Sequence, residues 1–240
     1  MTESSLVVSL LVGSVAIPTE VATAERFENV EIRVIRPRYF NKRKKLELGG
    51  EMSGIMNETF IYTLLASGIL TFHFTEQLAI EGGAALAFSI EKADKRILID
   101  EFEIKTKIFK TKYLAWGSLL WTPIYGKWQL PSGRLIYFDT FLSLGYGMTG
   151  IEWVYTDFCQ APTSEDAEPL PPNATKSYPT ILLGLGQRYF TSKKTAVRWD
   201  IKGHFLMYNR VDGECNPTDA EPGTGRHDNI TLALGLSRFL

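Results

Sequence analysis

The segment VRWDIKGHFLMY, residues 197–208, constrains the fold more than any other feature of this chain. Its odd positions are apolar or glycine, whereas Arg198, Asp200, Lys202 and His204 occupy successive even positions. A period of two is the pattern of a β-strand that faces two different environments. The charged face would point outward in a soluble sandwich and inward in a barrel surrounded by lipid, so the other strands must decide between these folds.

Segments with the same period recur along the chain, and alternately short and long connections join them after the first loop. An even number of strands with short turns at one end and long loops at the other is typical of bacterial outer-membrane barrels. Segments of about 10–15 residues suit a bilayer crossed at a tilt. The eight predicted strands cover residues 45–52, 60–74, 78–90, 112–122, 135–149, 180–190, 197–208 and 230–240.

The two faces of these strands differ in size as well as in polarity. One face carries large apolar residues, and the other carries Gly, Ala and Ser with scattered charges. Small residues fit a narrow lumen but solubilise an outer surface poorly. The sequence therefore predicts an all-β, eight-stranded antiparallel up-and-down transmembrane β-barrel. Acids and bases balance in its predicted interior charge network, which avoids unpaired buried charge and comprises Glu81, Asp139, Arg188, Arg198, Asp200, Lys202 and His204.

Aromatic residues near the strand ends support a lipid environment. Two girdles of aromatic side chains are expected where a barrel meets the two water–lipid boundaries. The predicted loop-end girdle contains Phe60, Tyr62, Phe88, Tyr146 and Tyr208, and the predicted turn-end girdle contains Phe72, Phe74, Trp121, Phe138, Tyr189 and Phe239.

The N-terminus has the form of an export signal. An apolar block at 6–17 is followed by Ala22-Thr23-Ala24, which predicts a signal peptide over residues 1–24. Its leading segment contains Glu3 and no Lys or Arg, so a buried N-terminal strand or helix is the alternative. Residues 25–44 are then a periplasmic N-terminal segment and residues 45–240 the barrel. No run of 18 apolar residues predicts a transmembrane helix.

The only two cysteines, Cys159 and Cys215, lie in polar, proline-rich segments. In an oxidising compartment a disulfide between two loops is expected. The alternative is a pair of unrelated surface thiols.

Five blocks of the chain, in order, resemble an outer-membrane β-barrel family of gliding and predatory bacteria of the myxobacterial and Bdellovibrio type. The resemblance implies an eight-stranded barrel in the bacterial cell outer membrane, and some barrels of this kind belong to the trans-envelope gliding machinery. It carries over no catalytic residues. The blocks are VIRPRYFNKRKKLELGG, HFTEQLAIEGG, WTPIYGKWQ, FDTFLSLGYG and GLGQRYFTSKKTAVRWDIKGHF.

Three functions remain open. The first is a non-enzymatic structural or adaptor barrel in an envelope-spanning assembly for motility or adhesion, embedded in outer-membrane lipid and meeting periplasmic or envelope proteins through Arg33–Lys45 and a turn at Tyr125–Trp128. The second is a narrow pore, which eight strands disfavour because side chains fill the lumen. The third is a lipid-modifying enzyme, although no Ser-His-acid spacing stands out around Ser143 or His204.

The net charge and the spacing of acidic residues exclude some classes of partner. A net charge of −1 at pH 7 predicts no bulk attraction to nucleic acid. The acidic loops lack the spacing of a metal-binding loop, and we expect no cofactor or metal.

Overall fold

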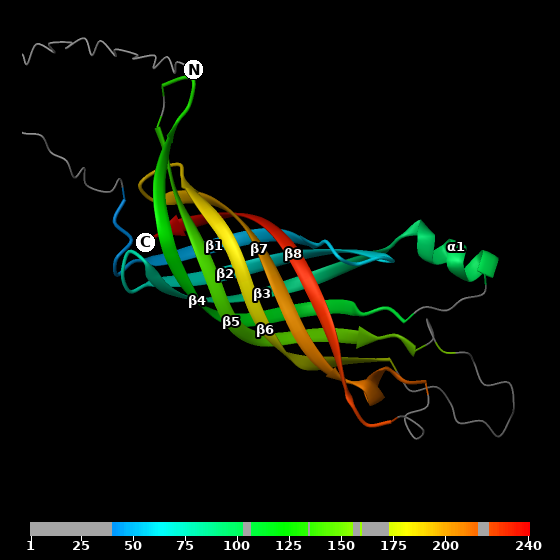
Figure 1. The fold of residues 1–240 in the computed structure, drawn as a ribbon. Helices are drawn as coiled ribbons and strands as arrows, with labels where there is room; N and C mark the ends of the chain where they lie inside the picture. The colour runs from blue at the N-terminus through cyan, green and yellow to red at the C-terminus, as the bar shows by residue number, and fades with distance from the viewer. Residues whose placement is uncertain (1–39, 103–106, 134, 156–158, 160–172, 216–220) are drawn as a thin grey trace, which may run out of the picture. The chain divides into compact units, whose positions relative to one another are not determined.

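The computed structural model describes residues 40–102, 107–133, 135–155, 159, 173–215 and 221–240. Eight antiparallel strands between Leu46 and Phe239 pair in chain order and close through β1 and β8 into a barrel (Figure 1). The predicted signal peptide and the segment up to residue 39 lie outside the described residues. The strands are β1 Leu46–Ile55, β2 Ile61–His73, β3 Leu78–Glu91, β4 Lys110–Gln129, β5 Leu135–Trp153, β6 Ala174–Phe190, β7 Thr195–Asn209 and β8 Thr224–Phe239.

The two ends of the barrel differ. The turn end carries the short connections β2–β3, β4–β5 and β6–β7, together with Phe40 and the C-terminal Leu240. The loop end carries longer connections, including the helix α1 (Ala93–Phe102) and the 3-10 turn η2 (Arg210–Gly213). Short turns at one end and long loops at the other match the predicted arrangement.

Helix α1 lies in the connection between β3 and β4, where the sequence analysis predicted no helix. Its sequence, ADKRILIDEF, contains good helix formers without Gly or Pro, and Asp94 in the first turn complements the helix dipole. Among the described residues, no helix is long and apolar enough to cross a membrane.

Strand β4 corrects one prediction. Tyr125–Trp128, which the sequence predicted as a turn, lies within β4 and pairs with β5 as far as Gln129↔Leu135. Pro123 and Gly126 favoured a turn, but a register shift between Trp121 and Ile124 accommodates Pro123, and the ladder then continues. The reversal falls at residues 130–134 instead.

The polarity of the barrel is inverted, as predicted. Leu86, Leu144 and Ile201 are 64%, 58% and 44% exposed, whereas Arg198 and Asp200 are fully buried. Large apolar side chains therefore cover the outside, and the alternating charged side chains point into the lumen. An outer surface of this kind is stable only in lipid.

Two of the predicted girdle residues face the lumen. Tyr62, Phe88 and Tyr146 are each 62% exposed at the loop end, as the girdle requires. Tyr208 instead packs on an internal cluster at the loop end, and Phe239 is 2% exposed in an internal cluster at the turn end. The alternation of side chains along a strand accounts for both. Tyr208 lies an even number of residues from His204 on β7, and Phe239 lies an even number of residues from the other lumenal residues of β8.

Candidate functional site: the charged lumen

The first ion-pair cluster lies in the turn-end half of the lumen. Arg188 on β6 pairs with Glu47 on β1, and its Nε lies 3.1 Å from Oδ1 of Asp139 on β5. The second oxygen of Asp139 accepts a hydrogen bond from Lys42, which precedes β1 and enters the lumen. The Nε2 atom of His73 lies 2.8 Å from the Glu47 carboxylate. Four strands and the N-terminal segment are therefore joined by one charge network.

The second cluster lies deeper and centres on Arg198 of β7. Its guanidinium meets three carboxylates, with Nε 2.6 Å from Glu51, one terminal nitrogen 2.7 Å from Glu81 and the other 2.9 Å from Asp200. Lys202 lies 3.1 Å from Asp200 and 3.3 Å from Glu51. Every member is at most 5% exposed. Such groups are stable away from water only because each charge has an opposite partner.

Phe141 on β5 separates the two clusters. Its ring is fully buried, and the guanidinium carbons of Arg188 and Arg198 lie 4.9 and 4.8 Å from the ring centroid. A cation near an aromatic face is stabilised by the quadrupole of the ring. Phe141 thus contacts both arginines while keeping their like charges apart.

The residues of the predicted interior charge network do not form one cluster in the structure. Glu81, Arg198, Asp200 and Lys202 are joined directly, whereas Asp139 and Arg188 belong to the turn-end cluster. His204 lines the lumen but makes no ion pair within the described residues, and its ring lies 6.4 Å from that of Trp116.

Sequence reasoning missed Lys42, Glu47, Glu51 and His73. Strand β1 was predicted, but its alternation was not recognised: Glu47 and Glu51 share one face while Leu48 and Met52 share the other, as in β7. Lys42 carries no such signal, because it lies outside the strands. Five carboxylates thus meet four Lys and Arg side chains and His73.

Aromatic side chains close the turn end of the lumen. Phe40 is 5% exposed and packs edge-on against Phe239, with ring centroids 4.7 Å apart, and against Phe190 at 5.8 Å. The ammonium group of Lys45 lies 4.0 Å from the centroid of the Phe40 ring. Phe40, which precedes β1, therefore covers the turn-end opening, and the Lys42 side chain extends from there into the lumen to Asp139.

The loop end is closed on the β5–β6–β7 side by a second buried cluster. The Trp153 indole donates to the Tyr178 hydroxyl at 2.8 Å, and that hydroxyl donates to Asp212 at 2.9 Å. The predicted disulfide joins Cys159 and Cys215, with 5.6 Å between their Cα atoms. It ties the β5–β6 loop to the segment after η2, over this aromatic cluster.

Little space remains inside. An internal cavity of about 20 Å³ lies between Trp116, Lys202 and His204, which is room for about one water molecule. Ser143 and His204 do not form a catalytic pair, because the Ser143 hydroxyl lies beside the Lys202 side chain, two positions along β7. Among the described residues, no three His, Cys, Asp or Glu side chains are grouped as metal ligands.

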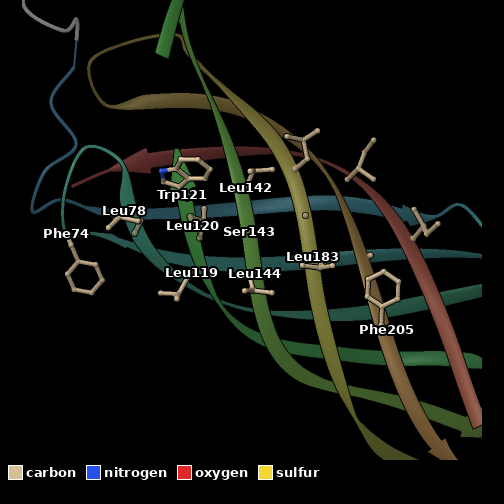
Figure 2. Close-up of a pocket in the computed structure, with 16 residues that line it drawn as sticks. Phe74, Leu78, Leu119, Leu120, Trp121, Leu142, Ser143, Leu144, Leu183 and Phe205 are labelled. Atoms are coloured by element: carbon tan, nitrogen blue, oxygen red, sulfur yellow. The ribbon is translucent and has the colours of Figure 1, made fainter. Parts of the chain in front are cut away.

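The outer face of β4, β5 and β6 shows the lipid-facing surface most clearly. Figure 2 shows Leu119, Leu144 and Leu183 projecting from neighbouring strands beside Trp121 and Phe205. The lining of this shallow hollow of about 930 Å³ contains no ionisable side chain. Acyl chains, which need no specific partner, suit such a surface.

No protein-family model matches this chain, and no curated protein matches it. Solved structures with a similar arrangement include the N-terminal β-barrel domain of OprF from Pseudomonas aeruginosa, at 8% identity and a TM-score of 0.47, covering 82% of this chain and 98% of that one. OprG from the same bacterium has 11% identity, a TM-score of 0.41 and coverages of 83% and 97%. Ail of Yersinia pestis has 10% identity, a TM-score of 0.38 and coverages of 82% and 97%.

The geometry of the chain itself defines its class. An even-stranded closed barrel with an apolar outside, a polar and filled inside, short turns at one end and long loops at the other is an outer-membrane β-barrel protein. The membrane in which it resides is the bacterial outer membrane, where barrels of this kind place their short turns in the periplasm.

Proposed function

We propose that this protein is a non-enzymatic, non-conducting barrel that acts as a structural adaptor in an envelope-spanning assembly, of the kind used in motility or adhesion. The observation that carries the proposal is the filled lumen. Two ion-pair clusters cross it, Phe40 covers its turn end, and its internal cavity is the size of one water molecule. A barrel built in this way offers its ends to other molecules and offers no path through its centre.

A projecting hairpin supplies the contact surface for such a role. Strand β3 pairs with β4 only as far as Leu78↔Trp121, yet β4 continues to Gln129 in a hairpin with β5 that reaches past the other turns (Figure 1). Residues 123–129 of β4 therefore have no strand partner on one side within the described chain. Ile124 and Trp128 are 55% and 57% exposed there. A free strand edge with apolar side chains is able to accept an extended segment of a periplasmic protein.

The basic segment Arg33–Lys45 is the second proposed contact. Its described part contains Arg43 and Lys44, which are exposed at the same end as the hairpin. Two surfaces at the turn end would let one envelope protein contact both.

Site-specific photocrosslinking in intact cells tests this function. A photoreactive residue at Trp128 should give one discrete adduct with a periplasmic or inner-membrane protein, whereas the same residue at Lys112, exposed near the loop end, should not. Purified barrel in planar bilayers should show no stable openings. Large stable openings, or the absence of a Trp128 adduct in a correctly assembled barrel, would contradict the proposal.

A further inference from the structure

Arg238 is the one basic residue that the alternation of β8 places on the lipid-facing side near the turn end. Its neighbours on that face are Leu232, Leu234 and Leu236, and it is exposed. Within the described residues its guanidinium has no hydrogen bond or ion pair. A cation on the lipid face is costly unless it reaches the interface and meets an anionic group. The lumenal network does not account for Arg238, because its side chain points the other way.

A groove runs along the outer face from Arg238. Its first part, about 520 Å³, lies between β1 and β7 across β8 and is lined by Leu48, Gly50 and Val197 among others. It adjoins a second part of about 820 Å³ that continues past Met52 to Ala66 on β2. The two parts share Gly50, Val197 and Leu236. The groove exists because Gly50 has no side chain where its neighbours on the strand, Leu48 and Met52, have large ones.

The turn beside Arg238 adds cations and hydroxyl groups. Thr195 lies directly opposite Arg238 in the β7–β8 ladder, and the Phe239 amide donates to the Lys194 carbonyl at 2.7 Å. Lys193 and Lys194 are exposed, and neither side chain has an ion pair within the described residues. Thr191, whose hydroxyl lies 2.9 Å from that of Thr195, lines the groove.

We propose that this groove binds one anionic phospholipid of the leaflet at the turn end. The phosphate would lie among Arg238, Lys193 and Lys194, and one acyl chain would follow the groove over Gly50 toward Met52. Charge complementarity identifies the headgroup, because Arg238 lines one end of the groove together with Thr191 and Thr195, and the exposed Lys193 and Lys194 lie in the adjoining β6–β7 turn. The uncharged hollow on the β4–β6 side has the apolar surface without the cations and therefore holds only bulk lipid.

Native mass spectrometry of the refolded full chain in detergent, titrated with phosphatidylglycerol or phosphatidylethanolamine, tests the site. We expect one tightly bound phosphatidylglycerol per barrel and weaker binding of phosphatidylethanolamine. Arg238→Gln should weaken phosphatidylglycerol binding about fivefold, and Arg238→Gln with Lys194→Gln by roughly the square of that factor. Lys127→Gln, which removes an exposed cation at the same end on β4, should leave binding unchanged.

A second pair of variants tests the acyl-chain part of the groove. Gly50→Leu fills it, and the new Cβ would meet only the Ser67 carbonyl oxygen, at 3.8 Å. Gly117→Leu places the same side chain on an open outer position of β4, outside the groove. Gly50→Leu should weaken binding and Gly117→Leu should not, with a folded barrel verified on gels for each. Equal binding of the two lipids, an equal loss in Lys127→Gln, or full binding in Gly50→Leu would overturn the proposal.

Discussion

Single buried charges carry much of the specificity of this lumen. Arg198 contacts three carboxylates from three strands, so its removal would leave Glu51, Glu81 and Asp200 facing one another with Lys202 as the remaining cation. A buried charge that loses its partner is far costlier than an exposed one, because water cannot replace the lost interaction.

Arg198→Met should therefore destabilise the barrel by about 3–5 kcal/mol. Arg226→Met on β8 is the matched control, because Arg226 pairs with Asp228 while 65% exposed, and water replaces most of that interaction, so the stability of this variant should stay close to that of the unmodified protein. Urea unfolding in vesicles measures both. Equal midpoints for the two variants would show that the lumenal pairs contribute little.

Glu58, in the loop between β1 and β2, makes that loop sensitive to pH. Burial raises the pKa of Glu58 from 4.5 to about 7, although Thr63 and Lys92 act in the opposite direction. The folded loop thus holds a proton that the unfolded loop releases above about pH 4.5. The contribution of Glu58 to the stability of the loop is therefore fully present below about pH 4.5 and is lost as the pH rises through about 7.

Hydrogen exchange at residues 56–60, corrected for intrinsic rates, should show less protection at pH 8 than at pH 5. In Glu58→Gln the difference should disappear, because a neutral amide does not titrate. A slope that persists in Glu58→Gln would assign the effect to another group.

At the scale of strands, inward glycines set how closely the barrel can pack. A Cβ at Gly186 on β6 would lie 2.5 Å from the Phe141 ring and 2.6 Å from the Trp199 carbonyl oxygen. The carbonyl belongs to the β7 backbone and cannot move without disturbing the ladder. Phe141 and the two arginines beside it can therefore occupy these positions only because residue 186 has no side chain.

Gly186→Val should destabilise the barrel by about 1–3 kcal/mol through overpacking. Gly117→Val, on the open outer face of β4, should be neutral or slightly stabilising, because β-branched residues favour strands. Urea midpoints of the two variants measure the difference, and an equally destabilised Gly117→Val would refute this account of glycine placement.

The existence of the eight strands and the facing of the clearly alternating ones were predictable from the sequence, but the facing of Tyr208 and Phe239 and the contacts between strands were not. Alternation in β7 identified Arg198, Asp200 and Lys202 as one lumenal row. The pairing of Arg198 with Glu51 depends on barrel closure and register, which no local pattern encodes. Lys42 enters the lumen from outside the strands, and the continuation of β4 past Pro123 depends on its pairing with β5, so both escaped sequence reasoning.

For the whole molecule, closure is the source of stability. Every strand except β4 is paired on both sides over most of its length, and β4 is paired on both sides from Tyr113 to Trp121, so the barrel exposes strand edges only towards its ends. We expect unboiled protein to migrate differently from boiled protein on a detergent gel, because the closed barrel resists detergent until it is heated. Mobility unaffected by boiling would argue against a closed barrel.

The tryptophans allow a direct test of the inverted polarity of the barrel. Trp121 is 51% exposed on the outer face, whereas Trp116, on the same strand, packs beside the lumenal cavity. Two single-tryptophan variants, each with the other four tryptophans replaced by phenylalanine, are folded into vesicles of brominated phosphatidylcholine. The account predicts strong quenching of Trp121 fluorescence and little quenching of Trp116, and equal or reversed quenching would contradict it.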